Sequence, residues 1–268
     1  MSALQKIIKF LIRKSPIHYY VSGRAYLNDI DYKATKIKSQ IESSKSPSRT
    51  EIINYLLTQF DGNTSYLEIG VRNPADNFDL INANEKYGVD PGKEFPDNNV
   101  AFQITSDEFF EKLEKEEILS GDKRFDLIFI DGLHLADQAD RDITNALKYI
   151  KKNGFVVLHD CNPPSWWHAR ENFQFHHSPA KKEWNGTTWK AFLKWRFNPV
   201  VYSCCIDTDW GIGILSKKIT IGRSITPVNP FYEFDDFDRN RIEYLNLISF
   251  DTFQSIIEDP EIQYCFKQ

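Results

Sequence analysis

The chain has 268 residues, of which 41% are hydrophobic, so it can bury one sizeable core and still carry extensions. Its formal net charge of −5 provides no basic field, so a nucleic acid partner is not expected. The cysteines have no metal-type spacing, and a chain this long does not need a disulfide framework; a reducing, cytoplasmic setting is expected. They are Cys161, Cys204, Cys205 and Cys265.

Residues 1–47 are predicted to be a helical extension that begins with an amphipathic helix. Its apolar residues share one face, and its basic residues lie mostly opposite. The apolar set is Leu4, Ile7, Ile8, Leu11 and Ile12, and the basic set is Lys6, Lys9, Arg13 and Lys14. No apolar run reaches the roughly 18 residues of a transmembrane helix, and lysines interrupt a signal-peptide pattern. Two interpretations stay open: docking on its own domain or on a partner in a homodimer, or contact with an anionic membrane.

Strands and helices then alternate. Ser48 and Glu51 form a capping-box pattern before a helix that should stop near Gly62, and Thr105 and Glu108 form another before a helix reaching about Glu117. A third helix is expected from about Ala136 to Ile150, ended by residues 151–154. The predicted strands are Ser65–Val71, Lys86–Val89, Val100–Ile104, Phe125–Ile130, Phe155–Leu158, Val200–Ile206 and Gly211–Leu215.

This pattern predicts an α/β fold with a doubly wound, Rossmann-like sheet of seven strands, mostly parallel. The last two strands are separated by only Asp207–Trp210, which suits an antiparallel hairpin and not a crossover helix. The expected division is a helical extension (1–47), a catalytic domain (48–220) and a C-terminal segment (221–268) that covers one side of the sheet.

The chemistry is expected to centre on residues 125–135, FDLIFIDGLHL. A buried strand stops at Asp131, and His134 follows three residues later. The next strand ends at His159 and Asp160. Ligands bind at the carboxyl ends of strands in open α/β sheets, so these groups should share one crevice.

A nucleoside site is predicted at the neighbouring strand ends. Gly70 follows the first strand, and Asp90 stands twenty residues later at the end of the second, where an acid holds ribose hydroxyls. The pattern GxGxxG is absent, and a pyrophosphate needs that glycine-lined approach. A nucleoside ligand without phosphates is therefore favoured over a dinucleotide.

These motifs, LEIGV, GVDPG, FDLIFIDGLH and GFVVLHD in this order, resemble the class I S-adenosylmethionine-dependent methyltransferases over about residues 48–218. IDGLH, HDCNPP and DTDWGIGIL are similar to the branch that methylates sugar hydroxyls, which includes metal-dependent enzymes for macrolide and aminocoumarin sugars and for surface glycans. The chain lacks the usual second glycine after Gly70, and it has His159 where metal-dependent members carry an acid.

The resemblance implies S-adenosylmethionine as cofactor, a divalent cation such as Mg²⁺, and a sugar or sugar-nucleotide substrate. It implies His134 as general base, and Asp131 and Asp160 as metal ligands, with His159 as the candidate third ligand. The implied cofactor-binding residues are Glu68, Gly70, Arg72, Asp90, Thr105, Ser106, Asp107 and Asp131.

The residue chemistry agrees with this interpretation. A sugar hydroxyl is a weak nucleophile, and a histidine can take its proton near neutral pH. A hard cation on two carboxylates would stabilise the developing alkoxide. The ring-rich segment between Pro163 and Trp195, which follows Asp160, is placed to form a substrate lid and is called the lid segment. The predicted substrate contacts are His159, Trp166, Trp167, His168 and Trp184.

Two other functions fit some of the same residues. His134, His159 and an aspartate approximate the two-histidine, one-carboxylate iron site of an oxygenase, which would consume oxygen without a methyl donor. A non-catalytic binding subunit on the same fold is the other alternative, and it would tolerate His134→Ala in the cell.

Overall fold

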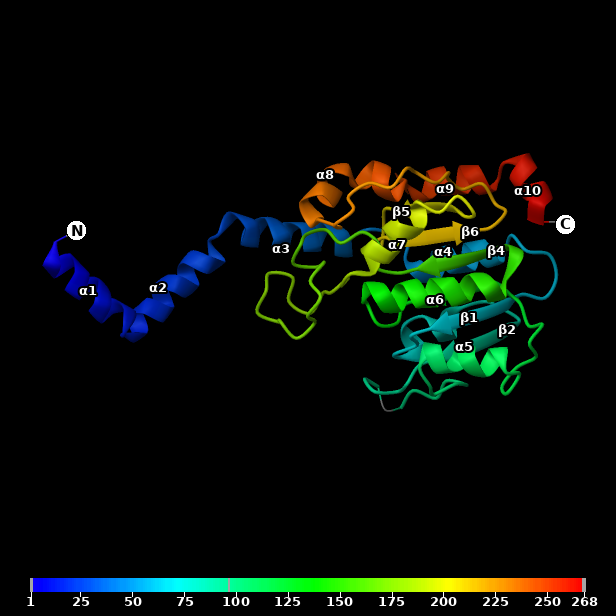
Figure 1. Cartoon of the computed structure of the whole chain (residues 1–268), viewed down its shortest axis with the longest axis horizontal. Helices are drawn as coiled ribbons and strands as arrows, with labels where there is room; N and C mark the ends of the chain where they lie inside the picture. Colours follow the sequence, from blue (N-terminus) through cyan, green and yellow to red (C-terminus); the bar gives the residue numbers. More distant parts are fainter. Residues whose placement is uncertain (1, 96, 267–268) are drawn as a thin grey trace.

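The structure is a computed structural model that describes residues 2–95 and 97–266. A seven-stranded sheet with the order β2-β1-β3-β4-β6-β5-β7 lies at its centre, between layers of helices (Figure 1). The strands are β1 (Ser65–Ile69), β2 (Glu85–Val89), β3 (Phe125–Ile130), β4 (Ile150–Leu158), β5 (Tyr202–Ile206), β6 (Ile212–Ser216) and β7 (Leu247–Ile248).

The helices of the domain are distributed over the whole chain after residue 48. They are α4 (Arg49–Leu57), α5 (Ser106–Glu114), α6 (Ala136–Tyr149), α7 (Thr188–Arg196), α8 (Phe234–Leu245), α9 (Phe250–Ile257) and α10 (Pro260–Phe266), with the short 3₁₀ helices η1 (Pro74–Asp76) and η2 (Phe78–Leu80). Three further helices precede them: α1 (Ala3–Arg13), α2 (Pro16–Leu27) and α3 (Ile30–Ser43).

The direction of the strands determines where the polar residues gather. β2, β1, β3 and β4 are parallel, β6 runs antiparallel to both β4 and β5, and β7 is parallel to β5. The carboxyl ends of β1 to β4 therefore share one edge of the sheet with the short linker between β5 and β6. The predicted mostly parallel sheet with an antiparallel hairpin is confirmed.

One member of the predicted set of strands is wrong. Residues 100–104 form a single parallel bridge, between Val89 and Phe102, and not a strand. The Val100 amide donates to Asn98 Oδ1, so a local turn uses the donor that a ladder would need. The seventh strand is β7 instead, which the sequence pattern did not reveal.

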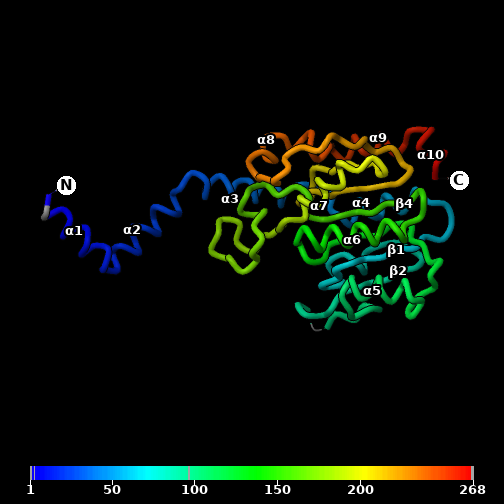
Figure 2. The backbone as a smooth tube through the Cα atoms, in the orientation of Figure 1, coloured from blue at the N-terminus to red at the C-terminus, as the bar shows by residue number. Residues whose placement is uncertain are grey.

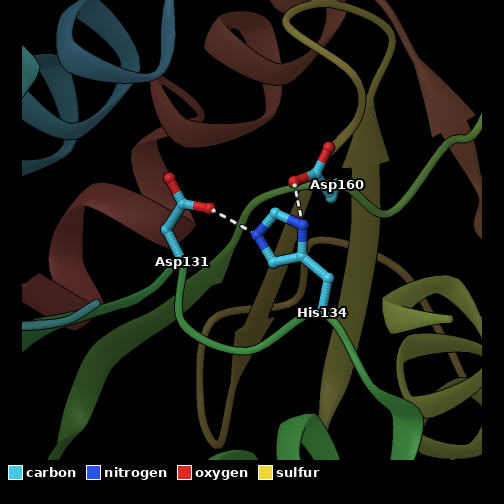
Figure 3. A group of neighbouring side chains, drawn as sticks. All are labelled: Asp131, His134 and Asp160. Carbon is cyan, nitrogen blue, oxygen red and sulfur yellow. Dashed lines mark hydrogen bonds and ion pairs between the residues drawn. The ribbon is translucent and has the colours of Figure 1, made fainter. Parts of the chain in front are cut away.

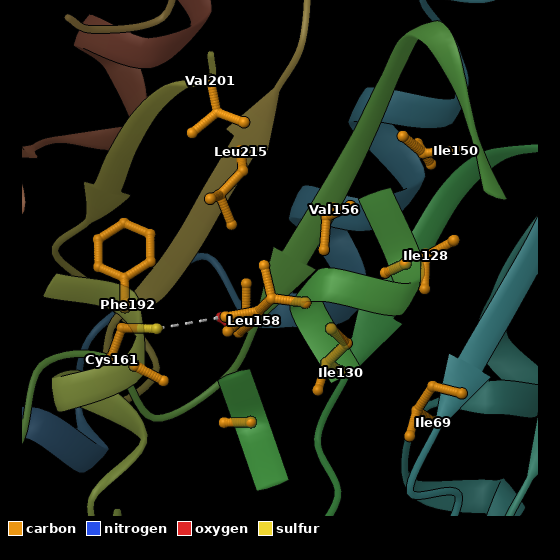
Figure 4. Packing of buried hydrophobic residues seen from close by; sticks show 14 of the residues in the cluster. Ile69, Ile128, Ile130, Ile150, Val156, Leu158, Cys161, Phe192, Val201 and Leu215 are labelled. Carbon is orange, nitrogen blue, oxygen red and sulfur yellow. Dashed lines mark hydrogen bonds between the residues drawn. The ribbon is translucent and has the colours of Figure 1, made fainter. Parts of the chain in front are cut away.

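Each face of the sheet has its own core, as the period of two along the strands requires. Ile128 and Ile130 of β3 face one core, which α5, α6, α7 and α8 cover (Figure 4). Leu127 and Phe129, which alternate with them, face the other core, under α4, α9 and α10. The strands are therefore buried on both faces, as a parallel sheet requires.

The C-terminal segment does not cover one side of the sheet, as predicted, but both. Phe237 of α8 packs in the first core, and Phe253 of α9 packs in the second. Between them β7 joins the edge of the sheet beside β5, so the chain passes from one face to the other. The predicted boundaries at residues 47 and 220 stay predictions.

The predicted helix starts are accurate, and the ends less so. Ser48 and Glu51 make both hydrogen bonds of a capping box, and the Thr105 side chain accepts the amide of Glu108. α4 ends at Leu57 and α5 at Glu114, each earlier than expected. Residues 151–154, predicted to end a helix, belong to β4, where the Lys151 ammonium binds the buried Asp126 carboxylate.

Helices α1 and α2 extend away from the domain, while the end of α3 packs against it (Figure 2). Thr35, Ser39 and Glu42 of α3 are buried, whereas α2 has no buried residue. Within the described part of the chain, no helix has the length and apolar character needed to cross a membrane. We call residues 2–28 the arm.

Candidate active site

The polar side chains predicted at the ends of two buried strands do meet. Asp131 follows β3, His134 lies three residues later, and Asp160 follows β4, the neighbouring strand. One potential ligand atom from each of them lies within 4.8 Å of the others. Figure 3 shows the His134 ring between the two carboxylates. We call these three residues the Asp–His–Asp group.

Each carboxylate of the group is paired with a different ring nitrogen of His134. Asp131 Oδ1 lies 3.2 Å from Nε2, and Asp160 Oδ2 lies 3.2 Å from Nδ1. Nδ1 is also 2.8 Å from the backbone oxygen of Trp184, which can only accept, so Nδ1 is assigned the hydrogen. Nε2 is then the nitrogen that gains or loses a second proton.

His159 does not take the position of a third metal ligand. Its Nδ1 lies 3.2 Å from Asp131 Oδ1 and 3.1 Å from Asp160 Oδ2, and its Nε2 lies 3.2 Å from Asp209 Oδ1. The ring is buried, and carboxylates occupy both nitrogens, so it offers no free atom to a substrate. Among the described residues, His134 and not His159 completes the group that can hold a metal.

Two residues of this site were missed in the sequence. Arg49 begins α4, and its guanidinium approaches Asp131 (Nε to Oδ2, 3.9 Å) and Asp209 (Nη1 to Oδ1, 3.5 Å). Asp209 also accepts the Arg49 amide at 2.7 Å. The predicted hairpin could have revealed Asp209. Because β6 runs antiparallel to β4 and β5, the linker between β5 and β6, which contains Asp209, lies at the edge where β4 ends.

Neighbouring charges set the protonation of the cluster. Burial alone would lower the pKa of His134, but Asp160 and Asp131 outweigh burial and raise it to about 9. Burial alone would raise the pKa of Asp131, but His159 and His134 outweigh burial and hold this pKa well below its ordinary value. The pKa of Asp209 falls to about 2, since His159 and Arg49 overcome its burial. Without a ligand, the cluster is therefore a network of ion pairs.

Glycines allow the close approach of the backbone segments that carry the group. Gly70 has φ +91°, and a Cβ there would lie 2.2 Å from the backbone oxygen of Asp131. Gly186 has φ +59°, and a Cβ there would lie 2.0 Å from the backbone oxygen of His134. Any side chain at either position would push a site residue out of place.

Gly70→Ala should therefore lower the free energy of unfolding by about 3 kcal/mol, from backbone strain and from displacement of Asp131. Gly62→Ala is the matched control, because Gly62 also has positive φ (+82°) but nothing within 4 Å of its added Cβ. It should cost about 1–2 kcal/mol. Urea unfolding measures both, and equal losses would show that contact with Asp131 carries no cost.

The residues predicted to bind a cofactor lie along the same edge, but they differ in burial and in their hydrogen-bond partners. Gly70 follows β1 and lies against the Asp131 backbone, and the Asp90 carboxylate accepts the Gly92 amide at 2.7 Å in the loop after β2. Glu68 is buried, and its Oε2 accepts the hydroxyl of Tyr66 at 2.5 Å and the amide of Asn77 at 3.0 Å. Burial raises the pKa of Glu68 to about 7.

The other predicted cofactor contacts lie at the surface. Arg72 is exposed and pairs with Asp76 at 3.2 Å. Thr105 caps α5, the Ser106 hydroxyl accepts from the Gln138 amide, and Asp107 pairs with Arg141. A hollow of about 320 Å³ opens beside the loop after β1, and its lining includes Asn73, Phe78 and Val100 but none of Gly70, Asp90 and Asp131.

Of the predicted substrate contacts, the structure brings Trp184 to the group. Its ring stacks on His134 at 5.1 Å between centroids, and its Nε1 donates to the Arg170 backbone oxygen. Trp166 is half exposed and stacks on Trp167 at 3.9 Å, within the same segment.

His168 is not a substrate contact in this structure. It is fully buried, and its ring nitrogens lie 2.9 Å from the hydroxyl of Ser39 and 2.8 Å from that of Ser165. Burial lowers its pKa to about 3, so it stays neutral. His168 therefore attaches the lid segment to α3.

The buried Asp142 of α6, near Ser106 at the start of α5, makes stability depend on pH. Burial raises its pKa to about 6 from 3.8, so the folded protein binds this proton more tightly than the unfolded chain. Stability is thus lost as pH rises through 6, by about 3 kcal/mol. Asp142→Asn should match the wild type at pH 4 and be about 3 kcal/mol more stable at pH 8, by urea unfolding. A constant difference would contradict this.

Comparisons with known proteins bear on this site. Residues 37–161 match a family model described as a methyltransferase domain. A comparison with curated proteins found no match. The matched range begins in α3, inside the predicted extension, and ends just after Asp160, so it contains the whole Asp–His–Asp group.

Among solved structures, an O-methyltransferase from Bacillus cereus in complex with SAH is 16% identical, with a TM-score of 0.42 over 76% of this chain and 98% of that one. A putative O-methyltransferase from Klebsiella pneumoniae is 12% identical, with a TM-score of 0.41 over 76% and 96%. MycE, from the mycinamycin biosynthetic pathway, in complex with Mg, SAH and mycinamycin VI, is 14% identical, with a TM-score of 0.42 over 74% and 57%.

At these identities and TM-scores, the similarity to these structures supports no conclusion about this chain. The family match and the observed sheet do agree: the matched range contains the parallel strands β1 to β4, at whose carboxyl ends the predicted site lies. Residues 37–161 are therefore similar to a methyltransferase domain, and the strands in this range form the doubly wound, mostly parallel sheet that the sequence predicts.

Proposed function

We propose that the chain is an S-adenosylmethionine-dependent O-methyltransferase that acts on a hydroxyl of a saccharide, either a nucleotide-linked sugar or a precursor of a surface polysaccharide. The observation that carries this proposal is the Asp–His–Asp group. It combines a proton acceptor with two carboxylates, beside Gly70 and the ends of β1 and β2. An alcohol acceptor needs such a base, because its own pKa lies far above neutral.

His134 is the proposed base. The Trp184 carbonyl and Asp160 both face Nδ1, which fixes the ring orientation and leaves Nε2 to take the proton. Asp131, 3.2 Å from Nε2, stabilises the imidazolium that forms. The side chain is 21% exposed, so an acceptor can reach it, in contrast to the buried ring of His159.

The donor set fits a divalent cation as well. The carboxylates of Asp131 and Asp160, in a group whose ligand atoms lie within 4.8 Å of one another, offer the oxygen ligands that such an ion prefers. Asp131 and Asp160 would hold it, and His134 would stay free as base. When bound, S-adenosylmethionine supplies an electrophilic methyl group, and the cation offsets the charge of the two carboxylates and of the developing alkoxide.

For the cofactor, the strand ends offer a matching site. Gly70 lets the backbone approach the ligand, and Asp90, at the end of the adjacent strand, would hold the ribose hydroxyls. Gly70 would approach the methionine part, with Glu68 in the same motif, and Thr105, Ser106 and Asp107 would lie near the adenine. Arg72 contributes only if it leaves Asp76, since the two are paired.

For the acceptor, Trp184 is the main proposed contact, because an indole face suits the apolar face of a sugar and this ring already stacks on the base. Trp166 and Trp167 would add to it if the lid segment closes over a substrate. The four free cysteines, three of them buried, are compatible with action in a reducing cytoplasm.

Isothermal titration of the whole chain with S-adenosylmethionine tests the proposal first, and no binding at millimolar concentration would contradict it. Transfer of a labelled methyl group to a panel of nucleotide sugars, with Mg²⁺ or with EDTA, then tests the acceptor and the cation. Cofactor binding without transfer to any saccharide would contradict the proposed sugar acceptor but would be consistent with a methyltransferase that acts on another acceptor.

The iron-oxygenase alternative has less support. Among the described residues, the group that can hold a metal contains one histidine, whereas that alternative needs two. Iron-dependent oxygen consumption without a methyl donor would favour it. A non-catalytic binding subunit would instead bind the cofactor and retain cellular function after His134→Ala.

A further inference from the structure

The arm, residues 2–28, differs in charge from the rest of the protein. Residues 1–28 contain no aspartate or glutamate and five basic residues, Lys6, Lys9, Arg13, Lys14 and Arg24. The whole chain has a net charge of −5, so the remaining residues carry −10. A basic segment on an acidic protein indicates an anionic partner.

The arm also exposes large apolar side chains on both of its helices. Within α1 the apolar side chains follow a helical period and face away from Lys6, Lys9 and Arg13. All of them are accessible: Leu4 66%, Ile7 56%, Ile8 47%, Phe10 60%, Leu11 60% and Ile12 41%. In α2, Ile17, Tyr19 and Tyr20 are 60%, 77% and 70% exposed. Exposed apolar side chains gathered on one face, as in α1, mark an interaction surface.

The domain itself does not cover this surface. Figures 1 and 2 show α1 and α2 extending away from the domain. The contact between the arm and the domain is at its far end, where the Tyr26 hydroxyl donates to the His177 backbone oxygen at 3.0 Å. The expectation that the helix docks on its own domain is not what this structure shows.

We infer that the arm is a docking surface for an anionic lipid bilayer, on which α1 lies in the plane of the headgroups. An eleven-residue helix is about 16 Å long, roughly half the thickness of the hydrocarbon layer, so it lies flat. Its apolar face enters the acyl boundary while Lys6, Lys9 and Arg13 meet lipid phosphates. Tyr19 and Tyr20 suit the same interface, where rings with a polar tip gather.

Charge favours a bilayer over a second copy of this chain. Two arms packed side by side would bring ten basic residues together without an acid between them. An anionic bilayer instead provides an apolar layer and negative charge on one surface, which matches both faces of α1.

The arm also connects to the candidate site. It continues into α3, where the Ser39 hydroxyl lies 2.9 Å from His168 of the lid segment, and Glu42 accepts the Trp210 amide at 3.0 Å, next to Asp209. The arm thus leaves the domain on the side of the sheet edge that carries the Asp–His–Asp group. Docking would hold that edge near the lipid surface.

Co-sedimentation of the full chain with vesicles tests this inference. Vesicles of phosphatidylcholine with 30% phosphatidylglycerol should bind the protein at least tenfold more tightly than vesicles of phosphatidylcholine alone, and 0.5 M NaCl should weaken the binding. Two variants should each bind at least tenfold more weakly: Ile8→Asp/Leu11→Asp, which disrupts the apolar face, and Lys6→Gln/Lys9→Gln/Arg13→Gln, which removes charge and keeps that face.

Val200→Asp/Phe231→Asp is the matched control, since both residues are exposed apolar positions of the domain (67% and 84%) outside the arm. It should bind like the wild type. Equal binding to both kinds of vesicle, or none to the anionic ones, would overturn the inference. So would a wild-type dimer in vesicle-free buffer, measured by analytical ultracentrifugation, that Ile8→Asp/Leu11→Asp converts to monomers, because the arm would then be a protein interface.

Discussion

His134→Ala should lower the turnover number of methyl transfer by about 10²- to 10⁴-fold, while the affinity for S-adenosylmethionine changes less than about twofold. The imidazole is proposed to act on the acceptor, and of its contacts Asp131, Asp160 and Trp184 only Asp131 is also predicted to bind the cofactor. Kinetics with saturating cofactor and isothermal titration measure the two effects separately. The wild-type rate should rise with pH as the imidazole loses its proton, and this rise should be absent from the pH–rate profile of the variant.

His176→Ala is the control for this variant, because His176 is an exposed histidine of the same lid segment. It should retain wild-type turnover. If His134→Ala lowers the affinity for the cofactor but keeps turnover at saturation, His134 is not the general base. If His134→Ala weakens binding of Mg²⁺ instead, then His134 is a metal ligand, as its membership of the Asp–His–Asp group allows.

Asp160→Asn should reduce Mg²⁺-dependent turnover by roughly a hundredfold or more, since a cation contributes several kcal/mol of charge stabilisation in such reactions. The substitution also removes one of the charges that raise the pKa of His134, so that pKa should fall below its value of about 9. Titration with Mg²⁺ measures the first effect, and histidine resonances followed by NMR measure the second.

The change to asparagine isolates the charge. Asp160 has φ +62°, a conformation that asparagine adopts more readily than most residues, so the backbone should be preserved. Asp137→Asn, at a position 75% exposed on α6, is the control and should leave turnover unchanged. If Asp160→Asn keeps wild-type turnover in Mg²⁺, Asp160 does not hold the cation, and its carboxylate forms only the ion pairs seen here.

The sequence alone determined the elements whose signals are local. Alternating apolar runs specify β1 to β6, and capping side chains at Ser48 and Thr105 specify where α4 and α5 begin, because these hydrogen bonds join residues three apart. It also determined that Asp131, His134 and Asp160 would meet, since parallel strands place their carboxyl ends at one edge. β7 escaped it because this strand is defined by pairing with the distant β5. Residues 100–104 were mistaken for a strand because their apolar pattern does not show that a turn at Asn98 uses the Val100 amide.

The tertiary structure decided which atoms face one another. The sequence placed His159 beside Asp160 and suggested a ligand, but only the fold brings Asp209 and Arg49, from distant segments, against that ring and makes it part of an ion-pair network. It also moved His168 into the interior, against Ser39. Local patterns specify elements because they act between near neighbours; the site depends on contacts across 50 to 160 residues, which no local pattern contains.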